Sequence, residues 1–273
     1  SEKDKFIIDQ YIMNGGKSLW FIDPVSASLD SLSFQKALIG LINKTNLDDQ
    51  LFKYGFRVNP ILIQDMQCGA LKIKTSPQGA ALKFDLFPWI YSPLLVSDES
   101  HPMTKNLDLI KSEFVSSIDT VGNNPNVKRQ FLIYSSNQSR TVNAPARISL
   151  EIINEPLDER YFPESRIPVA VLGEGRFESL YKNRLAPEIR DSHDIKFKEE
   201  SVPTRMIIVG DGDIIKNQYR VKSTGEIIPL TLVYDKHTNM NFAGKKDFIL
   251  NAIGYLLDDS GLMQVRNREI KLR

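Results

Sequence analysis

The sequence has few of the residues that build covalent or metal-linked frameworks. Its 273 residues include one cysteine, Cys68, and three histidines, His101, His193 and His237. A lone cysteine excludes an internal disulfide and leaves a cysteine-based zinc site without its ligands. The histidines are too scattered in the chain to match the spacing of a metal site. We therefore expect no bound metal.

Long hydrophobic runs and an excess of charge are also missing. No apolar run approaches the roughly 20 residues that a membrane span requires, and the first residues do not resemble a signal peptide. The net charge of +1, from 35 basic and 34 acidic residues, lacks the basic excess typical of nucleic-acid-binding proteins. We expect no nucleic-acid partner. A length of 273 residues allows a sizeable core, and we expect residues 1–273 to form a single α/β domain.

Continuous apolar runs predict strands that are buried on both faces. Met206–Val209 is the clearest, and it ends at Gly210-Asp211-Gly212-Asp213; Leu19–Ile22 and Ile167–Leu172 are similar. Strands of this kind are typical of a parallel sheet between two layers of helices. Helical patterns occur near both ends of the chain. Ser1 to Asp4 fits a capping box, and because a strand precedes the helix in a βαβ unit, we expect an upstream strand outside this chain.

The middle of the chain, around residues 56–150, is rich in turns and short strand-like segments. Together with the flanking helices and buried strands, this pattern predicts an α/β fold. The expected architecture is a three-layer sandwich with a mostly parallel sheet, of Rossmann-like or amidotransferase-like topology, and additional short β-strands.

Polar side chains follow two of the predicted buried strands. In open parallel sheets, ligands bind at the carboxyl ends of the strands. This rule makes a candidate ligand site of Asp211, Asp213, Glu174 and Asn217. The alternative is that the two aspartates cap the helix that follows, because a carboxylate at a helix start accepts hydrogen bonds from free backbone amides. The sequence leaves both interpretations open.

Three motifs fail the requirements for catalysis or nucleotide binding. Gly15-Gly16-Lys17-Ser18 resembles the end of a P-loop, but Tyr11 occupies the first glycine position and the order of helix and strand is reversed. Gly210–Asp213 has Ile215 where a dinucleotide fingerprint needs its third glycine. Cys68 lacks a histidine base and the strand–turn–helix elbow of a nucleophile. We therefore expect no catalytic residue and no cofactor.

Two residues are candidates for a partner surface. Trp89 lies between Pro88 and Ile90 in a predicted loop, where an aromatic side chain either contacts a partner or anchors the loop. His101 lies in a turn rich in serine and aspartate, where we expect either a capping role or exposure at the surface. The terminal segment Arg266–Arg273 contains four basic residues and one acid. It is either a solvated tail or a basic segment that leads toward a membrane surface.

Several segments together resemble GldG, the family of gliding-motility-associated auxiliary proteins of an ABC transporter in Bacteroidetes. The resemblance spans nearly the whole chain and is carried by Tyr11–Pro24, His101–Leu107, Pro168–Gly175, Arg205–Asp213 and Asp259–Arg273. It implies a domain on the periplasmic side of the cytoplasmic membrane, anchored by transmembrane helices outside this chain. It also implies work beside a membrane permease subunit and an ATPase.

The resemblance implies a fold related to the GIFT domain of an intraflagellar-transport subunit, which is similar to amidotransferase-like and sugar-binding α/β domains. It supplies no catalytic residues. We therefore expect a non-enzymatic, periplasm-facing auxiliary, substrate-binding-like component of an ABC transport system for gliding motility or export. The alternative is a sugar- or peptide-binding domain, or a degenerate amidotransferase-like enzyme. A cytoplasmic scaffold is a third possibility.

Overall fold

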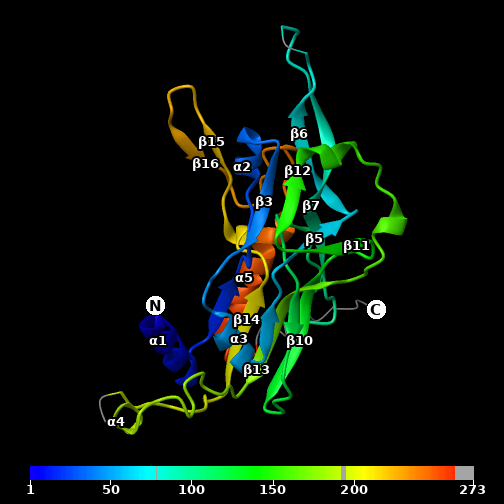
Figure 1. The fold of residues 1–273 in the computed structure, drawn as a ribbon. Helices are drawn as coiled ribbons and strands as arrows, with labels where there is room; N and C mark the ends of the chain where they lie inside the picture. Colours follow the sequence, from blue (N-terminus) through cyan, green and yellow to red (C-terminus); the bar gives the residue numbers. More distant parts are fainter. Residues whose placement is uncertain (78, 192–194, 262–273) are drawn as a thin grey trace, which may run out of the picture.

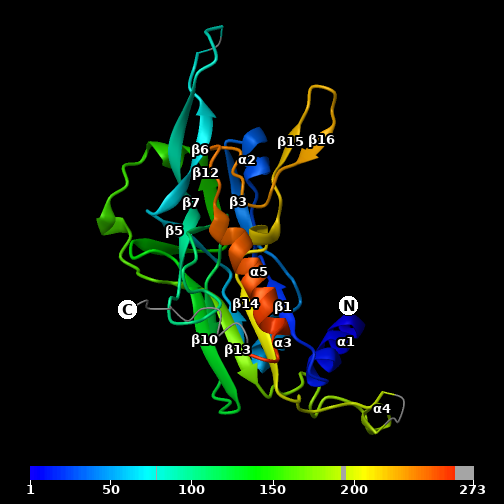
Figure 2. The same cartoon turned by 180° about the vertical axis from the view of Figure 1, so that it is seen from behind.

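A curled seven-stranded sheet runs through the molecule, with helices and shorter sheets packed around it (Figures 1 and 2). The structure, a computed structural model, describes residues 1–77, 79–191 and 195–261. In spatial order, the strands of the large sheet are β1 (Ser18–Phe21), β14 (Thr204–Val209), β13 (Pro168–Gly175), β10 (Val127–Tyr134), β7 (Phe84–Ser97) and β6 (Cys68–Lys74), and β7 also pairs with β8 (Ile110–Lys111).

The strand directions differ from those that the sequence pattern predicts. β1 and β14 run parallel, with Ser18 opposite Met206 and Phe21 opposite Val209. Every other neighbouring pair of this sheet, within the described ranges, is antiparallel. The prediction of a mostly parallel sheet is therefore wrong, and a Rossmann-like sandwich is not confirmed. The fold is a mixed α/β arrangement that consists mostly of strands.

Helices nevertheless cover both faces of β14, which explains its continuous apolar run. Ile207 and Val209 pack with Phe248 and Ala252 of α5 in one core. Met206 and Ile208 face the opposite way, into a second core with residues of α1 and α3. A continuous apolar run indicates that both faces of a strand are covered. It does not indicate whether the neighbouring strands run parallel or antiparallel to it. The helices are α1 (Glu2–Met13), α2 (Leu29–Phe34), α3 (Asp48–Tyr54), α4 (Pro187–Arg190) and α5 (Ala243–Leu257).

The ends of two helices follow from local sequence. The predicted capping box of α1 is confirmed, since the Ser1 hydroxyl accepts a hydrogen bond from the Asp4 amide and Asp4 returns one. α3 ends at Gly55; this glycine has φ +98°, in the left-handed region that it adopts without a Cβ penalty. The cap at the start of α3 is Leu47.

The remaining strands form small antiparallel sheets, and the predicted strand-rich region around 56–150 holds β4 to β12. The pairs are β2 (Val25–Ser26) with β3 (Ala37–Ile42), β3 with β12 (Ala146–Ser149), β4 (Phe56–Val58) with β9 (Ile118–Thr120), β5 (Ile61–Asp65) with β11 (Ser139–Asn143), and β15 (Tyr219–Val221) with β16 (Ile227–Pro229). Short 3₁₀ turns are η1 (Leu150–Asn154), η2 (Glu159–Tyr161) and η3 (Asp213–Ile215).

Both predicted partner-surface residues are buried, so that prediction is wrong. Trp89 lies within β7 rather than in a loop, and it is fully buried in a third core. Its ring packs against Tyr91 and Phe114, with centroid distances of 5.4 and 6.4 Å. His101 is 5% exposed; its ring lies 4.9 Å from that of Tyr255 and its Nδ1 accepts a hydrogen bond from the Met103 amide. The proline-flanked and polar contexts suggested loops, whereas long-range packing covers both side chains.

Candidate functional site

The carboxyl ends of the parallel strands β1 and β14 bring two aspartate-containing loops together. Asp23, just after β1, accepts a hydrogen bond from the Gly212 amide at 2.6 Å. A Cβ at Gly212 would lie 2.4 Å from the Asp23 carboxylate. Glycine is therefore required at this point because the two loops approach each other so closely.

Asp211 is a capping residue at the base of this site. It is fully buried. One carboxylate oxygen accepts hydrogen bonds from the amides of Asp213 and Ile214, at 2.7 and 3.2 Å, and the other accepts one from the Glu113 amide at 3.2 Å. Asp211 thus accepts the first amides of the short 3₁₀ turn η3, as the capping interpretation predicts, although the cap position itself is Gly212. Burial, with Asp213 and Asp23 nearby, raises the pKa of Asp211 well above its usual value.

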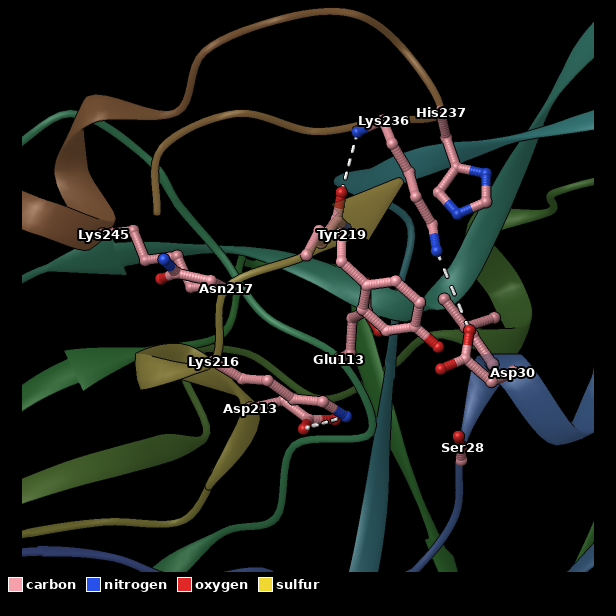
Figure 3. A pocket seen from close by; sticks show the side chains of 12 residues that line it. Ser28, Asp30, Glu113, Asp213, Lys216, Asn217, Tyr219, Lys236, His237 and Lys245 are labelled. Carbon is pink, nitrogen blue, oxygen red and sulfur yellow. Dashed lines mark hydrogen bonds and ion pairs between the residues drawn. The ribbon is translucent and has the colours of Figure 1, made fainter. Parts of the chain in front are cut away.

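A small polar cavity of about 60 Å³ opens above this turn (Figure 3). Asp213 and Asn217, two of the four predicted ligand residues, are in its wall. The other lining residues come from α2 and the segment before it, from the β8–β9 region, from β15, and from the segments around α5: Ser28, Leu29, Asp30, Glu113, Lys216, Gln218, Tyr219, Lys236, His237 and Lys245. Segments distant in sequence thus meet at one end of the parallel strand pair.

Some of the charges in this wall are paired with one another. Lys216 lies 3.2 Å from Asp213, and Lys236 lies 3.8 Å from Asp30; both pairs are visible in Figure 3. Behind the wall, Lys111 lies 2.7 Å from the buried Asp235. These pairs neutralise most of the charge in the site.

Glu113 and Lys245 differ from these groups and from each other in how they are paired. Glu113 has an ion pair at 3.7 Å with Lys111, which is already engaged by Asp235. Burial raises the pKa of Glu113 above its usual value. The Lys245 side chain makes no hydrogen bond or close ion pair among the residues that the structure describes, although Asp211 and Glu113 attract its charge. Burial lowers the pKa of Lys245, because the charged ammonium loses contact with water.

Glu174 does not belong to this site. β13 runs antiparallel to β14, which places Glu174 opposite Arg205 at the other end of both strands. There the Glu174 carboxylate lies 3.1 Å from Arg205 and accepts a hydrogen bond from the Tyr255 hydroxyl at 2.9 Å. The expectation that Glu174 joins Asp211 and Asp213 is wrong because it assumed parallel strands.

The sequence pattern missed the most informative residues of the site. Glu113 lies in the loop between β8 and β9, and Lys245 lies in the first turn of α5. Neither residue belongs to one of the sequence motifs described above. One local signal was available: α5 has no acidic residue in its first turn, although acids are favoured there.

In the described residues, the other candidate groups do not form a reactive-cysteine site or a metal site. Burial raises the pKa of the Cys68 thiol to about 11, so the thiol is neutral at physiological pH and lacks the thiolate of a reactive cysteine. In the described part of the chain, no three residues among His, Cys, Asp and Glu are grouped so as to hold a metal ion. His193 and the basic segment Arg266–Arg273 lie outside the described residues.

The fold and the site define a mixed α/β protein with a charged cavity where the parallel strands end. A family model described as an ABC-type uncharacterized transport system matches residues 1–252. The match covers most of the chain, and the protein therefore belongs to this family of auxiliary components of ABC-type transport systems. A comparison with curated proteins finds no match. Across residues 1–77, 79–191 and 195–261, no helix is both long and apolar enough to cross a membrane.

Proposed function

We propose that this protein is a non-catalytic, periplasm-facing auxiliary component of an ABC transport system that serves gliding motility or export. The observation that carries the proposal is the family match over residues 1–252. In this proposal the domain is anchored by membrane segments outside the chain and contacts the permease subunit. The ATPase belongs to the same assembly on the other side of the membrane.

The state of the nucleophile candidates supports a non-catalytic role. Nucleophilic catalysis needs a base within hydrogen-bonding reach of the nucleophile and a third group that orients the base. Asp211 is occupied by backbone amides, and the Cys68 thiol is protonated at neutral pH because burial raises its pKa to about 11. His101 is used in packing against Tyr255.

Co-purification of the transporter tests the assembly. The full-length gene product, tagged and extracted from its native membrane in mild detergent, is expected to carry the permease subunit and the ATPase at constant stoichiometry. An unrelated membrane protein with the same tag is the control for non-specific capture. Isolation of the tagged protein without either transporter subunit, from membranes that contain both, would contradict the proposal.

Protease access tests the location. In spheroplasts with an intact cytoplasmic membrane, added protease is expected to digest this domain while a cytoplasmic marker survives. Digestion only after the membrane is opened would place the domain in the cytoplasm and favour the scaffold alternative.

The cavity favours a second candidate function, small-molecule binding. It has a mixed charged lining that includes the half-buried Lys245, as in a site where a few polar groups orient a ligand. A sugar- or peptide-binding domain and a degenerate amidotransferase-like enzyme both predict a ligand here. Hydrolysis of a ligand that is abolished by Asp213→Asn, with the fold intact, would favour the enzyme.

A further inference from the structure

Helix α5 carries apolar side chains on its outer side as well as on the side that faces the core. From Phe248 to Leu257 it contains no charged residue. Phe248 and Ala252 pack into the core. Leu250, Ile253 and Leu257 are instead 55%, 43% and 71% exposed. A helix that is apolar on all sides is typically buried on all sides, so the outer side of α5 lacks, among the described residues, the cover that its composition predicts.

The three exposed residues form one row along the helix, which we call the α5 stripe. Their spacing of three and then four residues places them on a single face of an α-helix. Repeats of this kind line the seam where two helices pack against each other. Figure 2 shows α5 on the outside of the large sheet, with β1 and α1 beside it. The stripe is therefore placed to pack against another helix.

An open, mostly apolar groove of about 320 Å³ lies beside the carboxyl-terminal part of the stripe. A volume of this size is far above the roughly 10–15 Å³ that one water molecule needs, so the groove can receive a projecting side chain. Leu250 projects at the opposite end of the stripe. The residues that line the groove come from the end of α1 and the turn after it, from β1 and from α5: Tyr11, Gly15, Gly16, Lys17, Leu19, Ile253, Leu256 and Leu257.

A surface with a projection at one end and a recess at the other is complementary to a second copy of itself. In a two-fold contact, a residue i of one copy touches a residue j of the other, and the reverse. When two α5 helices cross antiparallel with the axis at Ile253, Leu250 of each copy lies against Leu257 and the groove of the other. The same contact is thus made twice, and the two Ile253 side chains meet at the centre.

The charged groups at the two ends of the stripe fit the same antiparallel arrangement. Lys246 is exposed, lies one turn before Leu250 and has no ion pair among the described residues. Asp259 follows the other end, where its carboxylate is 82% exposed and pairs with Lys17. Antiparallel packing brings Lys246 of one copy toward Asp259 of the other. Parallel packing would bring like charges together, which disfavours association.

We infer that the α5 stripe joins two copies of this chain in an antiparallel, two-fold contact centred on Ile253. Ile7 and Tyr11 of α1 extend the apolar surface and are 55% and 56% exposed. Side chains of this size and exposure offer on the order of 100 Å² each, so these two and the stripe supply about 500 Å² per copy. Two copies bury about 1,000 Å², the lower limit for a specific interface. The net charge of +1 per copy adds little repulsion.

Association of the chain in solution tests the inference. Sedimentation equilibrium of residues 1–273 between about 10 µM and 1 mM should show a mass that rises from one copy toward two. Leu250→Glu and Leu257→Glu each place a charge in the contact and are expected to weaken association at least about tenfold. Leu82→Glu is the matched control, because Leu82 is also 71% exposed but lies in the β6–β7 hairpin; it should leave association within about twofold.

Disulfide cross-linking tests the geometry, in a Cys68→Ala background so that the native thiol cannot pair. Ile253→Cys lies at the axis and is expected to form a disulfide between copies. The two Leu250 positions are separated by about 9 Å along the helices, which is beyond disulfide range. Leu250→Cys should therefore cross-link only when it is mixed with Leu257→Cys. Self-cross-linking of Leu250→Cys as efficient as that of Ile253→Cys would overturn the antiparallel geometry.

A chain that stays monomeric up to about 1 mM would overturn the inference, because even a weak contact is populated at that concentration. Association that is unchanged in both glutamate variants would overturn it too. In a monomeric chain, a lower free energy of unfolding in Leu257→Glu would point to a segment of the same chain as the occupant of the stripe. Loss of the permease from the co-purified assembly in that variant would point to the permease. Self-association is measured without the transporter, so its failure and failure of the transporter assignment are distinguishable.

Discussion

The two ends of β14 differ in how their basic side chains are paired. At the amino end, Arg205 lies 3.1 Å from Glu174, donates to the carbonyls of Tyr255 and Asp258, and stacks 5.0 Å from the centre of the Tyr255 ring. At the carboxyl end, the Lys245 side chain lines a cavity and has no such close partner among the described residues. Arg205 ties α5 to the sheet, whereas Lys245 makes no comparable tie.

This contrast separates charges that stabilise the fold from charges that serve a site. A paired group contributes to stability, and its removal leaves buried partners unsatisfied. An unpaired, partly buried charge lowers stability, and natural proteins retain such groups where function needs them. Removal of the paired Arg205 and removal of the unpaired Lys245 should therefore change the free energy of unfolding in opposite directions.

The largest effect is expected at Asp211, which joins the turn after β14 to the segment that contains Glu113. Asp211→Ala leaves the amides of Glu113, Asp213 and Ile214 buried without an acceptor, and should destabilise the protein by about 3 kcal/mol or more. The change is measured as the free energy of unfolding in urea. Asp213→Asn, at the cavity wall, is the matched control and should cost less than about 1 kcal/mol. Equal losses in the two variants would contradict the capping role.

The second-largest loss of stability is expected at Arg205, at the amino end of β14. Arg205→Met keeps part of the side-chain volume but removes the contacts with Glu174, Tyr255 and Asp258, at a cost of about 1–3 kcal/mol in urea unfolding. Arg205→Lys, which retains the charge without the planar fork, should recover only part of this loss. Unchanged stability in Arg205→Met would show that the network at this end contributes nothing.

Substitution of Lys245 should change the free energy of unfolding in the opposite direction. Lys245→Met is expected to stabilise the protein by about 0.5–1 kcal/mol at pH 7. The pKa of Lys245 is lowered in the folded state by burial, so protonation favours unfolding at neutral pH. The advantage of the variant should shrink as the pH rises toward the unfolded lysine pKa of about 10.4. Destabilisation at pH 7 would mean that Lys245 is paired.

The smallest effect is expected at Glu113, and it should depend on pH. Burial raises the pKa of Glu113 in the folded state, so the stability of the parent falls as pH rises through that pKa. Glu113→Gln should equal the parent near pH 4 and gain about 0.5 kcal/mol by pH 7. Thermal unfolding across this pH range measures the difference, and a variant that loses stability as pH rises would contradict it.

Local features of the fold could be predicted from the sequence, whereas strand direction could not. The capping box at Ser1 depends on neighbouring residues and is confirmed. Asp211 likewise accepts hydrogen bonds from the first amides of the turn that follows it. The apolar run at Met206–Val209 correctly indicates burial on both faces. It carries no information on whether the next strand is parallel, and Glu174 was misplaced for that reason.

The candidate site was half predicted. Asp213 and Asn217 line the cavity because they follow β14 directly. Glu113 lies about 100 residues before Asp213 in the sequence, and Lys245 lies about 30 residues after it. Only the tertiary fold brings the three residues to the same cavity. Trp89 shows the converse: its proline-flanked context resembles a loop, but neighbouring sheets bury it.

The central claim is that Lys245 faces the cavity as an ammonium without a close partner, and its ionisation tests this most directly. Heteronuclear NMR of the lysine side chains, followed against pH and assigned with Lys245→Met, reports the pKa of this group in the folded protein. We expect Lys245 to titrate below the ordinary lysine value of about 10.4, since burial lowers its pKa. A pKa at or above that value would show that a carboxylate already neutralises Lys245, and the contrast between the two ends of β14 would be lost.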